Sequence, residues 1–325
     1  MSKAPKPIAR GVIALAAAGT LVSATPSTPA FRVDVAGMDR AIKPGDDFYM
    51  FANGGWMKVT EVPPDRAAYG AFTVIDEEVN RRLRGLISGA GGPVQAFYEA
   101  YMDEDAIEKR GLAPVQPELD AIAKISDRAS LSRFLGSQLR ADVDALNNTR
   151  FHTDRPFGLW AAPEFAHPDR YAAYFFQGGL GMPDRDFYRN TDDKSRELQS
   201  KYRSHIAAVL GLAKVADSAA QADRIYGLEK KIADVHVSRT DSVDVHKADN
   251  PWTPAEFATR APGLDWAAFF GAAGLAGQPV IMVWHPSGVA GIAALVGSEP
   301  LNVWKEYLVF RTLDRASALL PRAFA

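Results

Sequence analysis

The chain of 325 residues is long enough for one large domain or two ordinary ones, and its 47% hydrophobic and 23% charged residues are typical of a soluble globular protein with a sizeable core. Its formal net charge of −2 gives no electrostatic attraction for nucleic acid or for an anionic membrane. The chain has no cysteine, which excludes disulfides, thiol catalysis and thiolate metal sites.

The first thirty residues have the pattern of a secretory signal peptide. Lys3, Lys6 and Arg10 form a basic start, an apolar run follows from Gly11 to Ala24, and small-residue cleavage motifs end at Ala24 or Ala30. The apolar run is too short and too rich in alanine to favour a permanent membrane span. A cleaved signal peptide is therefore expected, and an uncleaved membrane anchor is the alternative. We therefore expect residues 1–30 to direct the chain to the periplasm or to secretion.

A short capped helix is predicted near the N-terminus, on an arm formed by residues 31–62. Asp46 or Asp47 can cap the start of this helix by accepting its free backbone N–H groups. Asn53-Gly54-Gly55 tolerates positive φ and predicts that the helix ends there. Trp56 would then follow the helix as an apolar anchor.

Apolar residues at helical spacing predict further helices up to about residue 140. The predicted helices cover residues 66–88, 94–108, 115–125 and 130–140, and Ser130 is the expected N-cap of the last. The amino-acid composition then changes. Residues 157–165 and 171–177 are rich in aromatic residues and are flanked by proline, and this pattern predicts a β-hairpin.

The remainder of the chain is predicted to be mostly helical. Helices are expected over residues 193–211, 217–239, 252–259, 264–273, 287–296 and 300–320, with a polar loop over 241–254 and a buried strand over 279–284. The apolar run 279–296 reaches membrane-span length, but His285-Pro286 interrupts it, so we expect a strand and a core helix instead. The predicted fold class is mainly α-helical with a minor β-hairpin.

Two stretches resemble the N-terminal signatures of the neprilysin-type zinc metallopeptidases. The first runs from Asp46 to Trp56 and the second from Gln177 to Tyr188, in the family's order, and the resemblance covers about residues 36–325. The matching residues are Asp46, Asp47, Phe48, Tyr49, Asn53, Gly54, Trp56, Gln177, Gly178, Gly179, Leu180, Pro183, Asp186 and Tyr188.

The resemblance implies a particular domain organisation and a set of partners. Residues 63–325 would be the helical N-terminal domain, which forms a lid opposite the catalytic domain and encloses a chamber for small peptides. Residues 31–62 would be an arm that docks on the catalytic domain. The implied partners are a C-terminal catalytic half or small peptides.

The zinc motif of the family is absent from this sequence. Family members hold zinc with H-E-x-x-H on one helix and a downstream glutamate in E-x-x-x-D. The six histidines, His152, His167, His205, His236, His246 and His285, include no pair four residues apart, and none precedes a glutamate. We therefore assign no catalytic, cofactor-binding or metal-binding residue in this chain, and zinc only to the full-length family.

Three weaker signals have simpler interpretations. Glu99 and Asp103 match E-x-x-x-D, but such a pair is common on a solvated helix face. His236 and His246 flank an acidic loop, which is interpreted as solvated rather than as a chance metal site. His285 is expected to be a partly buried capping residue rather than a base.

Ala68 stands where some family members carry an arginine that grips a peptide carboxylate, so carboxydipeptidase-like recognition is not expected.

Three hypotheses follow for function. In the leading one, the chain is the N-terminal portion of a secreted zinc metalloendopeptidase and is inactive alone. The alternative is a non-catalytic module, derived from such a peptidase, that binds peptides or another protein. A decayed product that folds poorly and leaves apolar patches exposed is the third.

Overall fold

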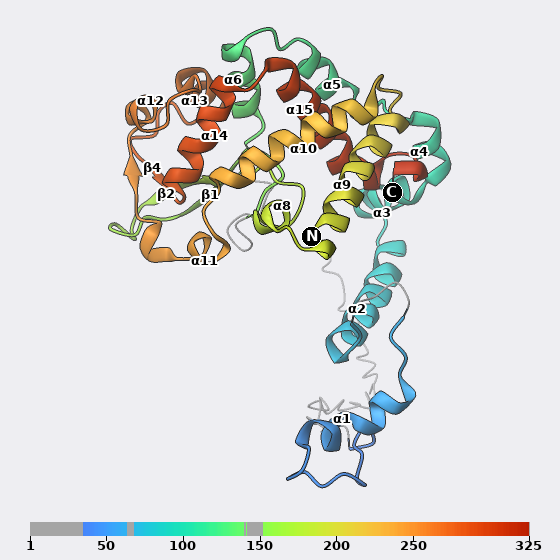
Figure 1. The fold of residues 1–325 in the computed structure, drawn as a ribbon. Coiled ribbons are helices and arrows are strands. Elements are labelled where there is room, and N and C mark those ends of the chain that lie inside the picture. The colour runs from blue at the N-terminus through green and yellow to red at the C-terminus, as the bar shows by residue number, and fades with distance from the viewer. Residues whose placement is uncertain (1–34, 64–67, 140, 142–151, 325) are drawn as a thin grey trace, which may run out of the picture. The chain divides into compact units, whose positions relative to one another are not determined.

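A computed structural model describes residues 35–63, 68–139, 141 and 152–324 of the chain. By its contacts the chain divides into two compact units, Met1–Leu86 and Ile87–Ala325 (Figure 1). The predicted signal peptide, residues 1–30, lies outside the described residues. The proposed boundary between an arm and a helical domain at residues 62 and 63 stays a prediction.

The first unit contains helix α1 (Phe48–Val59) and most of helix α2 (Ala71–Ser88). Asp47 caps α1 as predicted, because its side chain accepts a hydrogen bond from the Met50 amide at 2.9 Å. The predicted end of this helix at residues 53–55 is wrong, since α1 continues through Trp56 to Val59. A Cβ at Gly55 would lie 2.7 Å from the Met38 carbonyl oxygen, so this glycine serves the close approach of the preceding segment.

The second unit consists mainly of helices, as predicted. In chain order they are α3 (Gly92–Met102), α4 (Glu104–Arg110), α5 (Gln116–Ala123), α6 (Arg128–Ser137), α8 (Asp186–Arg189), α9 (Asp193–Leu212), α10 (Ser218–Val235), α11 (Arg239–Ser242), α12 (Phe257–Arg260), α13 (Trp266–Ala273), α14 (Pro286–Ser298) and α15 (Leu301–Ala316). None of the helices in the described part of the chain is long and apolar enough to cross a membrane.

Capping residues explain two differences from the predicted helices. The single helix predicted over 94–108 is two helices. Asp103 follows the end of α3 with a non-helical backbone, and its side chain caps α4 by accepting a hydrogen bond from the Ala106 amide at 3.0 Å. The N-cap of α6 is Asp127 rather than Ser130. Ser130 is the third residue of α6 and completes a capping box with Asp127.

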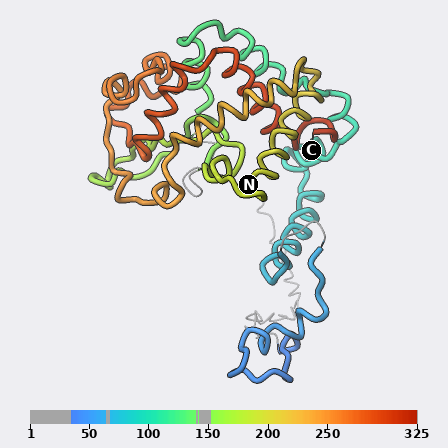
Figure 2. Tube along the Cα trace, in the orientation of Figure 1, coloured from blue at the N-terminus to red at the C-terminus, as the bar shows by residue number. Residues whose placement is uncertain are grey.

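A small mixed sheet has the strand order β1-β2-β4-β3. The predicted hairpin is confirmed as antiparallel strands β1 (Phe157–Pro163) and β2 (Tyr171–Gln177). The predicted strand near residue 280 is confirmed as β4 (Ile281–Val283), which lies parallel to β2 although a hundred residues separate them (Figure 2). The predicted loop over 241–254 is partly wrong, because it contains the end of α11 and strand β3 (Pro251–Trp252).

Aromatic side chains fill the core on both faces of this sheet. On one face Phe175 lies 5.8 Å, between ring centroids, from Phe269 of α13, and both side chains are fully buried. On the other face Trp160 stacks on Tyr174 at 5.3 Å. Helix α10 packs against α9, α14 and α15 and so connects the sheet to the helical part of the second unit (Figure 1).

A candidate site at the glycine-rich signature

The chain from Gln177 to Tyr188 leaves strand β2 and passes through the most crowded part of the second unit. A Cβ at Gly178 would overlap the Arg155 carbonyl oxygen, and one at Gly181 would overlap the Tyr202 hydroxyl. Gly179 has a φ of +92°, which disfavours any side chain. Glycine is therefore required at these three positions, all of which lie within the predicted signature stretch, and Gly178 and Gly179 are among its matching residues.

A buried carboxylate anchors this glycine-rich loop. Glu229 of α10 is fully buried, and it accepts hydrogen bonds from the Tyr188 hydroxyl at 2.6 Å and from the Tyr202 hydroxyl at 2.9 Å. The Tyr188 oxygen in turn accepts hydrogen bonds from the amides of Gly181 at 3.0 Å and Met182 at 2.9 Å. Burial raises the pKa of Glu229 above its ordinary value, and it raises the pKa of Tyr188 well above that of a free phenol.

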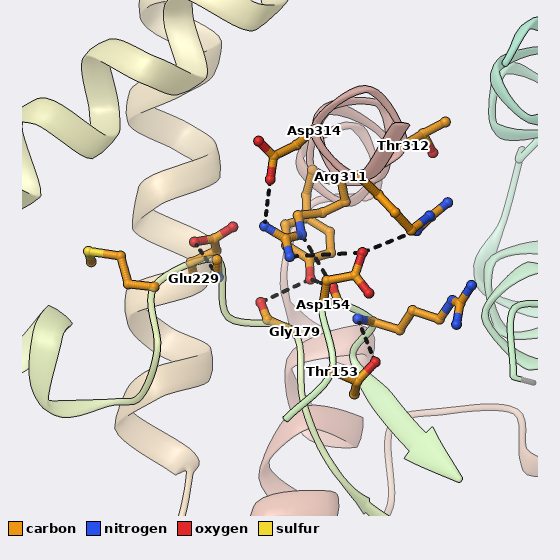
Figure 3. Close-up of polar contacts among 12 residues, drawn as sticks. Thr153, Asp154, Gly179, Glu229, Arg311, Thr312 and Asp314 are labelled. Atoms are coloured by element: carbon orange, nitrogen blue, oxygen red, sulfur yellow. Dashed lines mark hydrogen bonds and ion pairs between the residues drawn. The ribbon is translucent and has the colours of Figure 1, made fainter. Parts of the chain in front are cut away.

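Helix α15 holds the loop from the other side. The Tyr307 hydroxyl donates to the Gly179 carbonyl at 2.9 Å, and Arg311, whose side chain is only 6% exposed, donates from Nε to the Asp154 carbonyl at 3.2 Å. Figure 3 shows Arg311 between Asp314 and Asp154, with Glu229 beyond the loop. The buried guanidinium of α15 and the buried carboxylate of α10 are thus compensating charges on two helices that pack against each other.

A second set of contacts joins the loop to the end of α10. His236 Nε2 lies 2.9 Å from the Gly178 carbonyl oxygen, and Arg185 Nη1 donates to the His236 carbonyl at 2.7 Å. Gln177 Oε1 accepts from the Val237 amide at 3.0 Å. The peptide group between His236 and Val237 is therefore held through both its oxygen and its nitrogen by side chains of the signature.

Two buried imidazoles support this arrangement in their neutral form. Burial lowers the pKa of His236 to about 3 and that of His285 to about 4. His285 Nδ1 lies 3.4 Å from the Gln177 amide nitrogen, and its Nε2 lies 3.1 Å from the Ser242 carbonyl oxygen. His285 is the N-cap of α14 as predicted, but it is buried and its side chain connects β2 to α11 instead of capping the helix.

A cavity of about 620 Å³ lies beside these contacts. Its polar lining comes from both ends of the signature and from the segment after α10, and the residues are His152, Thr153, Gln177, Asp184, Arg185, His236, Arg239 and Ser242. Leu180, Pro183, Val237 and Val243 provide an apolar part of the wall. A cavity of this size holds a small organic molecule.

The two predicted signatures occupy different places in the structure. Gln177, Leu180 and Tyr188 of the second are buried together at the loop. The first signature lies in the other compact unit, where Phe48 and Tyr49 are 69% and 65% exposed. No role in catalysis or binding follows from these positions alone.

The weaker candidates do not form a site. Asp103 caps α4, and Glu99 accepts a hydrogen bond from Gln95 at 2.7 Å on α3. His236 is buried against Gly178, whereas the His246 backbone amide donates to Asp244 Oδ1, which caps the same short turn. Within residues 35–63, 68–139, 141 and 152–324, no three His, Asp or Glu side chains are grouped so as to hold a metal ion.

The anchor Glu229 was missed by sequence reasoning, although one signal pointed to it. Glu229 precedes two lysines, so it resembles a residue of a solvated helix face. It also lies four residues after Ile225 and three before Ile232, on the apolar stripe that predicts the buried face of α10. A charged residue on such a stripe requires partners when it is buried.

Comparison with known proteins assigns the chain to a family. Residues 44–325 match the family model of the N-terminal part of peptidase family M13. The chain therefore belongs to peptidase family M13, and this confirms the resemblance to the neprilysin-type enzymes. It is 26% identical over 307 residues to mouse endothelin-converting enzyme-like 1 and 21% identical over 305 residues to human endothelin-converting enzyme 1.

Solved structures agree with this assignment. The chain superposes on zinc metalloprotease ZMP1 of Mycobacterium tuberculosis in complex with an inhibitor, with a TM-score of 0.79 and 29% identity, over 90% of this chain and 45% of that one. PepO of Lactobacillus rhamnosis shares the fold at a TM-score of 0.68 and 16% identity. The chain spans about 40% of the length of the endothelin-converting enzyme relatives.

Proposed function

We propose that this chain is the non-catalytic N-terminal portion of a zinc metalloendopeptidase that cleaves small peptides. One observation carries the proposal: the match to family M13 extends over residues 44–325, yet the sequence contains no H-E-x-x-H. The zinc ligands and the general base would then come from residues outside these 325.

Three of the six histidines, His205, His236 and His285, are already held by other groups of this chain. His236 Nε2 faces the Gly178 carbonyl, and His285 is held between the Gln177 amide and the Ser242 carbonyl. His205 is paired with Asp314 at 2.7 Å. Because a ring nitrogen of each is engaged in these contacts, the three imidazoles do not converge on a common point where zinc could be held.

An exposed apolar stripe on α2 supports association with a catalytic half. The stripe was predicted from helical spacing, and the helix is confirmed, but its apolar residues remain exposed: Phe72 90%, Ile75 58%, Val79 45%, Leu83 46% and Leu86 70%. A helix with one apolar stripe normally buries it against another element. We propose that the occupant is the C-terminal half of an M13 peptidase, since this chain spans less than half of its relatives.

The experiment compares the purified chain alone with the chain mixed with a separately produced C-terminal half of an M13 peptidase. Zinc content and cleavage of a fluorogenic peptide are measured for each part and for the mixture. We expect chelator-sensitive cleavage in the mixture and none by the 325-residue chain. Chelator-sensitive cleavage by the chain alone, with stoichiometric zinc, would refute the proposal.

We also propose that the protein works in the periplasm or outside the cell. The support is the signal-peptide pattern of residues 1–30 in the sequence. Mass spectrometry of the protein exported by a bacterial host should show a new N-terminus after Ala24 or Ala30. Retention of Met1 on a membrane-bound product would favour an uncleaved anchor instead.

A further inference from the structure

A series of ion pairs runs from the surface of α9 into the interior of the second unit. His205 Nε2 lies 2.7 Å from Asp314 Oδ1, and Asp314 Oδ2 lies 3.5 Å from Arg311 Nη1. The side chain of His205 is 47% exposed, whereas that of Arg311 is 6% exposed. Asp314 therefore connects an imidazole that solvent reaches to a guanidinium that solvent barely reaches.

Beyond Arg311 the ion pairs continue to α5. Asp154 Oδ2 lies 4.0 Å from Arg311 Nη2 and 3.3 Å from Arg315 Nη1. Arg315 Nη2 in turn lies 2.7 Å from Glu118 Oε1. Positive and negative side chains therefore alternate from α9 to α5, and His205 occupies one end of the series.

This series has an excess of negative charge when His205 is neutral. Its two guanidinium groups face three carboxylates, which are Asp314, Asp154 and Glu118. Glu229, the fully buried carboxylate of α10, interacts electrostatically with Arg311 and adds to the negative side. A proton on His205 supplies a third cation, whereas a neutral imidazole keeps only the hydrogen bond to Asp314.

The charged groups that act on His205 are Asp314 and Arg311, both on α15. The hydrogen bond to Asp314 raises the pKa of His205 above 6.5, although burial and Arg311 oppose this. The ion pair is therefore charged below pH 6.5 and loses its positive member as the pH rises through the raised pKa. Other ion pairs on α9 and on the elements packed against it do not involve His205; they are Arg196–Asp193, Lys201–Glu197, Arg203–Asp223, Arg185–Asp186, Arg189–Asp234, Arg224–Glu306, Lys231–Glu299 and Arg322–Glu104.

Arg311 connects this series to the glycine-rich loop in two ways. A Cβ at Gly181 would lie 2.7 Å from Arg311 Nη1, so the backbone of the loop packs directly on the guanidinium. Arg311 Nε donates to the Asp154 carbonyl at 3.2 Å, and the carbonyl of the preceding Thr153 accepts the Gly179 amide at 3.0 Å. A displacement of the guanidinium therefore changes the contacts that hold the loop.

We propose that His205 is a pH-dependent clamp on the glycine-rich loop. Protonated His205 balances the charge of Asp314, and Arg311 then stays in place against Gly181. When His205 is neutral, Arg311 is the only cation beside Asp314 among the described residues, so it is drawn toward this carboxylate and the loop opens more often. The cavity of about 620 Å³ changes with it, because the loop forms part of the cavity wall. The clamp consists of contacts within this chain and does not rest on the proposed peptidase function.

The test is hydrogen–deuterium exchange of the complete chain, measured by mass spectrometry at about pH 6 and about pH 8.5, on either side of the raised pKa. After correction for the intrinsic pH dependence of exchange, peptides that cover residues 178–188 should exchange at least about threefold faster at the higher pH. Peptides from α13, which packs on α6, serve as the reference and should not change. Equal acceleration of α13 and of the loop would indicate a loss of global stability and would overturn the proposal.

Two substitutions of His205 separate its charge from its hydrogen bond. His205→Gln keeps a donor for Asp314 without a charge, so the loop should exchange at the faster rate at both pH values. His205→Arg carries a permanent charge, so the loop should keep the slower rate at both. His167→Gln is the matched control, because His167 is exposed in the turn between β1 and β2, and this variant should retain the pH dependence of the parent chain.

The variants decide the proposal in opposite directions. If the loop of His205→Gln keeps the pH dependence of the parent chain, the proposal is wrong, and rapid exchange of the His205→Arg loop at the higher pH also contradicts it. Because His205 is half exposed, both variants should fold, and thermal melts establish this. If only one of them folds, its comparison with His167→Gln still separates the two outcomes.

Discussion

Tyr188 donates a hydrogen bond of 2.6 Å to Glu229, and this contact ties the glycine-rich loop to the middle of helix α10. The same phenolic oxygen accepts the amides of Gly181 and Met182. One side chain thus satisfies a buried carboxylate and two backbone donors. Removal of the Tyr188 hydroxyl leaves all three groups without this partner, so it should lower the stability of the fold measurably.

Tyr188→Phe should lower the free energy of unfolding by about 1–3 kcal/mol, because it removes the hydroxyl and leaves buried polar groups unpaired. Urea unfolding followed by circular dichroism measures the change. Tyr171→Phe is the control, since Tyr171 is 76% exposed and the same change there should cost less than about 0.5 kcal/mol. Equal effects of the two changes would show that Glu229 does not depend on Tyr188.

A glycine pair tests the packing around Gln177. A Cβ at Gly288 of α14 would overlap the Gln177 side chain, so Gly288→Ala should destabilise the protein by about 1–3 kcal/mol. Nothing lies within 4 Å of a Cβ at Gly227 in the middle of α10, and Gly227→Ala should stabilise it by about 0.5–1 kcal/mol. We therefore expect the two substitutions to change the melting temperature in opposite directions, and thermal melts of both variants measure this. A neutral Gly288→Ala would contradict the close packing.

Acid should destabilise the fold through the buried imidazoles. The folded-state pKa of His236 is about 3 and that of His285 about 4, both below the unfolded value of 6.5. Between these values the unfolded chain binds more protons, so the contribution is present above pH 6.5 and is lost as the pH falls. Each histidine contributes a slope of up to about 1.4 kcal/mol per pH unit. His236→Gln keeps a donor for Gly178 and should reduce the slope of stability against pH between pH 6.5 and 4. An unchanged slope would mean that His236 titrates normally.

His205 should behave in the opposite way. Its hydrogen bond to Asp314 raises its pKa above 6.5, so the stabilisation by the protonated pair is present below pH 6.5 and is lost as the pH rises through the folded-state pKa. An NMR titration of the imidazole measures this value directly. Asp314→Asn should lower the pKa of His205, and a pKa that does not move would exclude the ion pair.

The exposed stripe on α2 should make the isolated chain associate with itself at high concentration. Phe72 and Leu86 are 90% and 70% exposed, so Phe72→Glu with Leu86→Glu should reduce association without lowering the melting temperature. Light scattering and sedimentation measure association, and the melt tests the fold. Phe176→Glu is the contrasting variant, because Phe176 is fully buried and should lose stability strongly. If the double variant still associates, a surface other than the α2 stripe is responsible for the self-association.

Local patterns along the chain determined most of the fold. Helical spacing predicted α9, α10 and α15, the aromatic segments predicted the hairpin of β1 and β2, and Asp47 was a correct cap because a short polar side chain acts on its immediate neighbours. Both signatures were also recognised from the order of their residues, and the family match over residues 44–325 confirms that recognition. The missing zinc motif, too, is a property of the sequence itself.

Contacts between distant segments were decided only by the tertiary structure. Gly55 was predicted to end α1, but the helix continues past it. Its missing side chain instead leaves room for the Met38 carbonyl group to approach the helix. Glu229 looked solvated, yet it is buried because Tyr188 and Tyr202 reach it from other helices. The cavity at Gln177 and Arg185 has the same origin, since its walls come from segments about sixty residues apart. Local sequence reports the conformation a segment prefers, whereas desolvation and packing depend on neighbours that only the folded chain brings together.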